Sequence, residues 1–285
     1  MKINSCLALI ICTFLLSCER YLDNVELPEF KQKLVLNSFL SPHDSISFIS
    51  VTSNKKLYGA LNQQEATGSL TGILSDGSRE ISLTKAANGF TFRKQDMLLE
   101  EGKKYTLNIS SDKGLHARAS TIIPVKREVK IEIDTSRVFY DYGINTGQGW
   151  WELRADIFLT DYEGEENFYS YAVRQVIYNS LYPWYPYDFS FYPMESTVFN
   201  DNNRDGKRLY VSTVNYSDVS DDDSSNLVVY ILQTDREYYT YHHSMDRFTS
   251  SGDPFTEISP AYSNVEGGLG IMASYVVDSL VFRLK

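Results

Sequence analysis

Cys18 is the residue of this sequence whose chemistry is clearest, because it ends the run Leu15-Leu16-Ser17-Cys18. A leucine three positions before a cysteine, with a small residue directly before it, matches a bacterial lipobox. In a lipobox the cysteine thiol receives a diacylglycerol thioether and becomes the first residue of the mature chain. Two or three acyl chains on one residue anchor a protein stably, whereas a single chain is marginal. The pattern predicts lipidation at Cys18; the alternative is ordinary secretory cleavage, in which this cysteine has no role.

The residues before Cys18 have the features of a secretory signal. A basic residue is followed by an apolar run from Cys6 to Leu16, which is too short for a permanent membrane-spanning helix of about 20 residues. We therefore expect residues 1–17 to be a signal peptide and residues 18–31 to be a polar, partly acidic, lipidated tether. All three cysteines lie at or before Cys18, so no disulfide scaffold or cysteine-based metal site is expected in the rest of the protein.

A second candidate for chemistry is the set of oxygen-bearing side chains Asp201, Asn203 and Asp205, followed by Gly206. Oxygens at positions 1, 3 and 5 with a glycine at position 6 reproduce the first half of a calcium-binding loop. The bidentate glutamate expected at position 12 is missing, and Ser212 stands there instead. The pattern predicts at most a weak calcium site; the alternative is a polar turn between two strands.

The histidines do not suggest a nucleophilic triad. The sequence has four histidines and no G-x-S-x-G motif, whereas a triad needs a serine or cysteine beside a histidine and a carboxylate. His242 and Asp246 would share one face of a helix, but a zinc site needs three or four ligands and no further histidine than His243 is near. We therefore predict a protein that is not an enzyme, and we interpret both histidines as polar residues on the exposed face of a helix.

The segment from Leu181 to Pro193 is rich in aromatic residues and contains three prolines. Because proline cannot donate a hydrogen bond to a β ladder, the segment is expected to be a loop or a sheet edge. Stiff aromatic loops with polar tips are common binding surfaces, which stack sugars or dock proteins. The alternative is a cap whose rings are buried against the sheet. The residues predicted to contact a ligand or partner are Tyr182, Trp184, Tyr185 and Tyr187.

The first half of the sequence consists of short strands separated by turns, without a helical period. Apolar residues that alternate along the chain, as at Tyr105, Leu107 and Ile109, are typical of strands with one buried face. The pattern predicts an immunoglobulin-like β-sandwich over residues 32–125. We interpret Tyr105 as either a tyrosine corner or a plain core residue. The predicted strands cover residues 33–40, 46–51, 69–74, 80–85, 89–94, 104–110 and 116–124.

The second half has longer, more aromatic strands and one helix. Thr234 and Glu237 match a T-x-x-E capping box, and the apolar residues after them recur at intervals of three and four. This predicts an amphipathic helix near residues 235–249 within a second antiparallel β domain over residues 126–285. The predicted fold class is therefore all-β. The predicted strands cover residues 129–134, 150–161, 168–178, 208–216, 227–233 and 270–284.

The composition fits a folded body with a core and argues against a nucleic-acid partner. The 285 residues are 42% hydrophobic and 22% charged, with a formal net charge of −10. No second apolar stretch approaches the length of a membrane span. The expected form is a soluble body on a lipid tether.

Three features together resemble a known family. They are the lipobox followed by a first strand at residues 33–40, the segment Gly102-Lys-Lys-Tyr105-Thr-Leu, and the closing segment Asn264-Val-Glu-Gly-Gly-Leu-Gly270 after a tyrosine-rich helix. Over essentially the whole mature chain, the sequence resembles a domain-of-unknown-function family of Bacteroidota outer-membrane lipoproteins. The family has no agreed catalytic residues. We interpret the closing glycines as backbone devices rather than a phosphate cradle, since no helix follows them.

The resemblance also implies partners and a location. Members of this family are commonly encoded beside TonB-dependent outer-membrane receptors, which implies a role in nutrient capture or transport at the cell envelope. The expected function is that of a non-catalytic, lipid-anchored accessory component of such an uptake system, with the receptor β-barrel as partner. The alternatives are a stand-alone glycan- or peptide-binding lipoprotein and a structural or assembly subunit of an outer-membrane complex. The expected location is the outer membrane, on its periplasmic or its cell-surface face.

Overall fold

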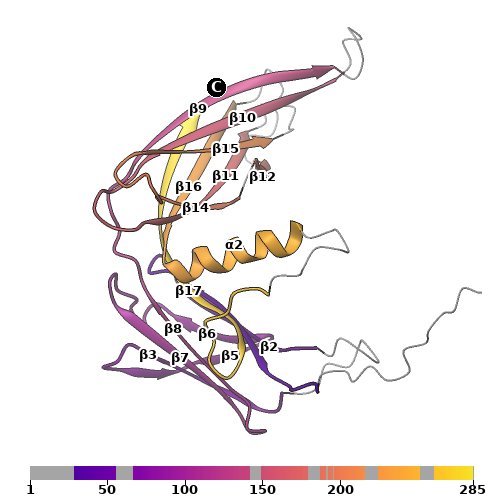
Figure 1. The fold of residues 1–285 in the computed structure, drawn as a ribbon, viewed down its shortest axis with the longest axis vertical. Helices are drawn as coiled ribbons and strands as arrows, with labels where there is room; N and C mark the ends of the chain where they lie inside the picture. Colours follow the sequence, from indigo (N-terminus) through magenta and orange to yellow (C-terminus); the bar gives the residue numbers. More distant parts are fainter. Residues whose placement is uncertain are drawn as a thin grey trace, which may run out of the picture. The chain divides into compact units, whose positions relative to one another are not determined.

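The structure, a computed structural model, describes residues 29–55, 67–141, 149–178, 187–190, 192–194, 196–215, 224–250 and 260–284. The chain separates into two units, Met1–Lys31 and Gln32–Lys285, and the account below concerns the second. Most of the described residues are in strands, and they form three sheets (Figure 1). The predicted all-β class is confirmed. In the described part of the chain, no helix combines the length and the apolar character that a membrane crossing requires.

The first eight strands enclose the core of the N-terminal half. One layer is the run β1-β2-β6-β5 of a larger sheet, and the other is a separate sheet with the order β4-β3-β7-β8. The alternation predicted from the sequence is present, because Tyr105, Leu107 and Ile109 of β7 are all fully buried. The strands are β1 (Leu34–Leu40), β2 (Ile46–Ser53), β3 (Leu70–Ser75), β4 (Glu80–Ser82), β5 (Thr84–Ala86), β6 (Gly89–Arg93), β7 (Lys104–Ser111) and β8 (His116–Ile122).

The remaining strands enclose a second core. A sheet with the order β13-β15-β10-β9 packs its buried face, with Leu153, Ala155 and Ile157, against buried residues of β11 and β16 such as Tyr171 and Val229. The elements are β9 (Lys130–Asp141), β10 (Gly149–Thr160), β11 (Phe168–Tyr178), β12 (Tyr187–Ser190), β13 (Tyr192–Pro193), β14 (Val198–Asn200), β15 (Arg208–Asn215), β16 (Ser224–Thr234), α2 (Arg236–Ser250) and β17 (Leu269–Arg283).

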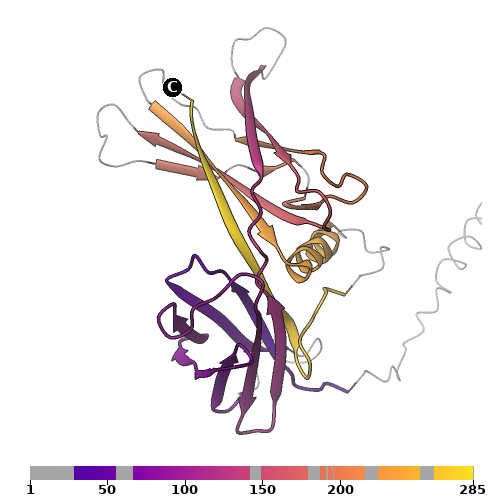
Figure 2. The same ribbon diagram turned by 90° about the vertical axis from the view of Figure 1, so that its left-hand side faces the viewer.

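Strand β17 belongs to both cores. Its first part pairs in parallel with β1, from Val35 opposite Leu269 to Leu40 opposite Ser274. Its second part pairs antiparallel with β16, starting from Tyr275 opposite Thr234. Figure 2 shows this strand, in yellow, running from the N-terminal strands to the C-terminal ones. One sheet with the order β12-β11-β16-β17-β1-β2-β6-β5 therefore passes through both halves of the chain.

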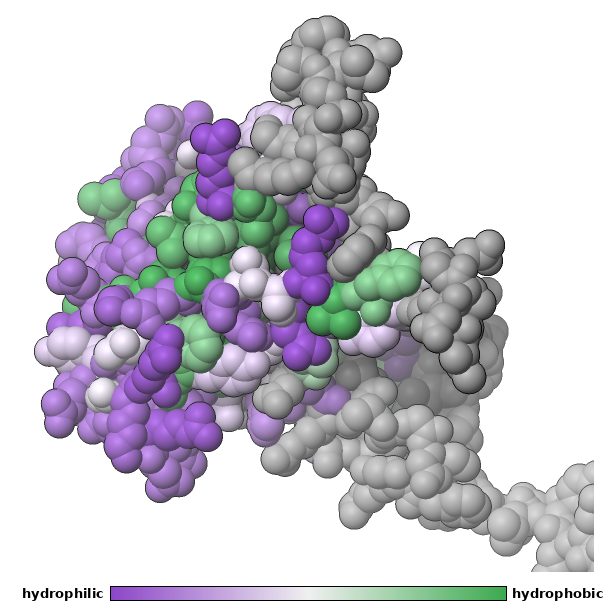
Figure 3. Space-filling view, turned by 90° about the horizontal axis from the view of Figure 1, so that it is seen from above, coloured by the Kyte–Doolittle hydropathy of each residue, from purple (hydrophilic) through white to green (hydrophobic). Residues whose placement is uncertain are grey.

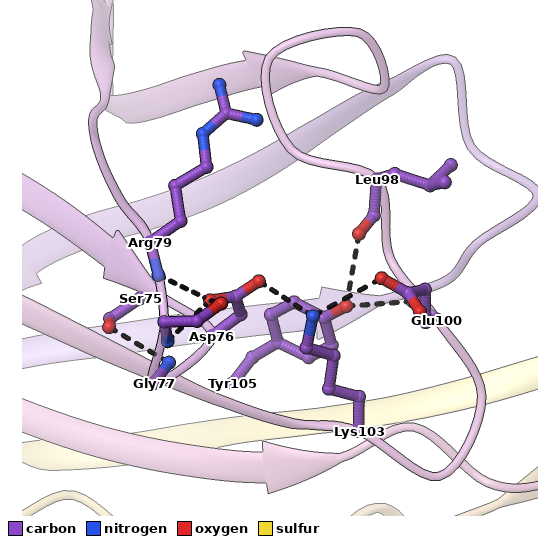
Figure 4. A network of polar contacts seen from close by, with 9 residues as sticks. Ser75, Asp76, Gly77, Arg79, Leu98, Glu100, Lys103 and Tyr105 are labelled. Carbon is purple, nitrogen blue, oxygen red and sulfur yellow. Dashed lines mark hydrogen bonds and ion pairs between the residues drawn. The ribbon is translucent and has the colours of Figure 1, made fainter.

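Tyr105 forms the hydrogen bonds of a tyrosine corner (Figure 4). Its side chain is fully buried, its hydroxyl donates to the Leu98 carbonyl (3.1 Å), and the Glu100 amide donates to the hydroxyl oxygen (2.8 Å). Nearby, the Lys103 ammonium lies 2.8 Å from an Asp76 carboxylate oxygen. This ion pair and amide donors from the turn hold the pKa of the Asp76 carboxyl well below its usual range. The two hydrogen bonds of Tyr105 attach the backbone at Leu98 and Glu100, before β7, to the core.

The helix is present, but its cap differs from the predicted one. It covers Arg236–Ser250, close to the expected 235–249. The predicted cap at Thr234 is wrong: the Tyr238 amide donates to Oδ1 of Asp235 (2.8 Å), whereas Oγ1 of Thr234 is buried without a partner among the described residues. Asp235 is therefore the N-cap of α2.

Candidate functional site

The residues predicted to contact a ligand lie largely outside the described residues, as does Cys18. Tyr182, Trp184 and Tyr185 are not described, and Tyr187 is described only by its backbone at the start of β12, opposite Ile177 of β11. The described pieces of the aromatic segment are β12, at the end of one sheet, and β13, at the end of another. Edge positions agree with the prediction made from the prolines. The structure does not test the ligand role of these residues.

Two of the three predicted calcium residues, Asp201 and Asp205, lie in a cluster of three carboxylates. Ligand atoms of Asp161, Asp201 and Asp205 lie within 4.8 Å of one another. Asp161 directly follows β10, and antiparallel pairing of β10 with β15 brings it beside the turn that precedes β15. The sequence pattern missed Asp161 because it is far from the other two along the chain. Asn203, the third predicted residue, adopts a left-handed backbone conformation, with φ of 60°.

Hydrogen bonds within the turns already engage these carboxylates. Asp161 accepts from the Tyr169 hydroxyl (2.5 Å) and from the Gly206 amide (3.0 Å), and Asp201 accepts from the Asn167 amide (3.0 Å). Burial raises the pKa of Asp161, and the negative charge of Asp201 raises it further. Burial and the bond to Asp161 also raise the pKa of the Tyr169 hydroxyl. The cluster thus joins two turns to β11; calcium binding there stays a prediction.

Replacement of Asp161 by alanine is expected to lower the free energy of unfolding by about 2–3 kcal/mol, because the buried Tyr169 hydroxyl loses its acceptor and the Gly206 amide loses its own. Urea unfolding followed by tryptophan fluorescence measures this. The control is Asp205→Ala, which removes an exposed carboxylate of the same cluster and should cost less. Equal losses in the two variants would contradict the role assigned to Asp161.

One of the two histidines of α2, His242, lies in surroundings different from those predicted. The His242 ring lies 4.2 Å from that of Tyr238 and 5.4 Å from that of Phe39, and burial lowers its pKa. The His243 ring stacks on Tyr239 at 5.5 Å. The interpretation of His242 as a residue on the exposed helix face is therefore wrong. Among the described residues, neither histidine belongs to a group of three potential metal ligands.

The segment Asn264–Gly270 closes the N-terminal core between its two sheets. Glu266 forms a β-bridge with Arg118 of β8, and the next residues lead into the pairing of β17 with β1. Gly267 and Gly270 have positive φ angles of 73° and 103°. A Cβ at Gly270 would lie 2.0 Å from the Leu36 carbonyl oxygen. These positions require glycine for backbone reasons, as the sequence predicted.

Comparisons with known proteins place the chain in a family. No curated protein matches it. A family model described as Domain of unknown function (DUF4249) matches residues 23–280, which include every described strand from β1 to β16 and most of β17. Since the match covers far more than half of the sequence, this chain belongs to the DUF4249 family.

Proposed function

We propose that this protein is a non-catalytic lipoprotein of the outer membrane, anchored through a diacylglycerol on Cys18, which serves as an accessory component of a TonB-dependent nutrient uptake system. The observation that carries the proposal is the lipobox at residues 15–18, a few residues before the family match begins at residue 23. A polar tether between anchor and β body suits a protein that works at a membrane surface. The receptor partner rests on the resemblance of the sequence to lipoproteins encoded beside such receptors.

Exposed apolar side chains supply a surface for a protein partner. Val138 and Phe139 on β9 and Val281 on β17 are 39%, 38% and 61% exposed. Figure 3, viewed from the end where the C-terminus lies in Figure 1, shows hydrophobic residues gathered in one area with hydrophilic residues beside them. Apolar surface rimmed by polar residues is typical of protein contact sites. It supports a role in which the protein binds another protein.

Replacement of Cys18 by alanine is expected to move the protein from the membrane fraction to the soluble fraction, because the thioether to diacylglycerol cannot form. The measurement is cell fractionation together with the intact mass of the purified protein. Cys12→Ala, which changes a cysteine inside the predicted signal peptide, is the matched control and should remain in membranes. Retention of the Cys18 variant in membranes would contradict the anchor.

The partner is tested by affinity purification of the tagged full-length protein from detergent-solubilised membranes. The expected result is recovery of a β-barrel receptor that an unrelated tagged lipoprotein does not recover. Recovery of other outer-membrane proteins without a receptor would favour the assembly-subunit alternative. Recovery of no partner would contradict the accessory role and favour the stand-alone alternative.

Stand-alone binding of a glycan or peptide is the second candidate, and the aromatic segment favours it. If the segment binds such a ligand, Trp184→Ala is expected to weaken binding about five- to a hundredfold, because one stacking contact on an aromatic side chain contributes about 1–3 kcal/mol. Glycan and peptide arrays followed by calorimetry on the 19–285 protein provide the measurement. Tyr210→Ala, which removes an exposed ring on β15, is the control. Equal affinities for the Trp184 variant and the unchanged protein would exclude the segment as the site.

A further inference from the structure

A segment near the end of the chain covers one edge strand of each sheet around the N-terminal core. These edge strands are β1 and β8. Strand β1 pairs with β2 on one side and with β17 on the other. Strand β8 pairs with β7 on one side and bonds to Glu266 on the other, through two backbone hydrogen bonds of 2.9 and 2.7 Å with Arg118. Residues 264–274, called here the closing strap, therefore join the two sheets of a core whose other residues, apart from Val276, come from residues 34–123.

The second part of the closing strap, from Ile271 to Ser274, lies inside the protein. Ile271, Met272, Ala273 and Ser274 are all fully buried. Four consecutive buried residues indicate a strand covered on both faces, as in the centre of a sheet. Met272 is a member of the N-terminal core cluster, together with Val265 and Val276. The strap thus supplies interior side chains that the N-terminal half lacks.

On the side of the strap away from β1, its backbone groups form hydrogen bonds with Asn264 and Asp235. The Asn264 amide group donates to the Met272 carbonyl (2.8 Å) and accepts from the Met272 amide (3.0 Å). Two residues further along β17, the Asp235 backbone amide donates to the Ser274 carbonyl (3.0 Å), and the Asp235 carboxylate accepts from the Ser274 amide (3.1 Å). These bonds continue the ladder with β16, which begins at Tyr275. The position of the strap is therefore specified by bonds as well as by packing.

At Gly268 and Gly270 the strap lies too close to β1 to carry a side chain. A Cβ at Gly268 would lie 2.8 Å from the Leu34 carbonyl oxygen and 3.0 Å from the Cβ of Ala117. At Gly270 it would lie 2.0 Å from the Leu36 carbonyl oxygen. Gly268 thus lets the strap lie against both β1 and β8, and Gly270 lets it lie close to β1.

We propose that the closing strap makes folding of the N-terminal core depend on the C-terminal strand, so that residues 34–123 do not reach their stable packed state until residues 264–274 are in place. The paired residues Val35 and Leu269 are separated by most of the chain, and such distant contacts form late because the connecting loop must first be closed. The inference concerns folding and does not depend on the proposed function.

The first test follows refolding of the unchanged 19–285 protein by pulsed hydrogen exchange and mass spectrometry. Peptides from β1–β2 and β7–β8 are expected to become protected in the same kinetic phase as peptides from β17. Protection of the N-terminal peptides in an earlier phase than β17 would overturn the proposal.

The second test compares Gly270→Ala with Gly114→Ala in the same protein. Both glycines have positive φ angles, of 103° and 80°, so both variants carry backbone strain, but a Cβ at Gly114 meets no atom within 4 Å. Gly270→Ala is expected to abolish slow exchange in β1, β7 and β8 as well as in β17, whereas Gly114→Ala retains it. Slow exchange in β1, β7 and β8 of the Gly270 variant, with loss confined to β17, would overturn the dependence.

Discussion

Replacing Asp235 with asparagine is expected to make the free energy of unfolding independent of this residue's titration. In the unchanged protein, the free energy of unfolding should decrease by up to about 4 kcal/mol as the pH rises from about 4 to about 7. The carboxyl of Asp235 is buried, and burial raises its pKa to about 7, with a further contribution from the negative charge of Glu237. In the described part of the chain, its hydrogen-bond donors are the hydroxyls of Thr121 and Ser274 and the amides of Ser274 and Tyr238. All of these donors are neutral, so none of them offsets the burial of the negative charge as a cation would.

The sign of this effect follows from linkage between protonation and folding. Between the ordinary aspartate pKa near 4 and the raised value near 7, the folded protein holds a proton on Asp235 that the unfolded chain has released. The contribution of Asp235 to stability is therefore full below about pH 4 and is lost as the pH rises through about 7. Asparagine is neutral at every pH and caps helices about as well as aspartate. The variant should therefore lose the pH dependence. It should also lose one of the two amide bonds that the carboxylate oxygens accept, from Tyr238 and from Ser274, because asparagine has a single side-chain acceptor oxygen.

The measurement is urea unfolding at a series of pH values, with circular dichroism to verify that α2 is retained. The slope of the free energy of unfolding against pH between about 4 and 7 should be shallower in Asp235→Asn than in the unchanged protein. Identical slopes in the two proteins would show that Asp235 is not the titrating group.

Replacing Asn264 with alanine is expected to lower the free energy of unfolding by about 3 kcal/mol, because the amide and carbonyl of the fully buried Met272 both lose their partner. The closing strap would lose its bonds on the side away from β1. Urea unfolding at fixed pH measures the loss. The matched control is Asn54→Ala, which removes an exposed side-chain acceptor of the Lys33 amide and should cost less than about 1 kcal/mol. Comparable losses at the two asparagines would contradict the role of Asn264 in holding the strap.

Several elements were predictable because their signals are local. Alternating apolar residues in β7 predict a strand with one buried face, and Tyr105, Leu107 and Ile109 are buried in it. The helix was predicted within one residue at each end. Its cap was not, since Thr234 and Asp235 are both capping residue types. The choice between them depends on Ser274 and Thr121, which bond to Asp235 from distant parts of the chain.

Some candidate sites also have a local signal in the sequence, whereas the carboxylate cluster does not. The lipobox at Cys18 and the aromatic residues around Trp184 are sequence features, and they remain predictions because they lie outside the described residues. Asp161 could not be found from the sequence, because only the pairing of β10 with β15 brings it to Asp201 and Asp205. Carboxylates in a cluster are recognisable in a sequence only when they fall in one short loop.

The sequence by itself determined the all-β class, most strand positions, the helix and the need for glycine at the closing segment, because each depends on the periodicity or backbone preference of a few adjacent residues. Only the tertiary structure decided that β17 pairs in parallel with β1 and that Asn264 and Asp235 hold it there. Pairing between distant strands depends on which buried faces and backbone groups fit together in the packed core, and local patterns along the chain do not encode that choice. A sequence that reads as two consecutive β domains thus folds with its last strand as part of both cores.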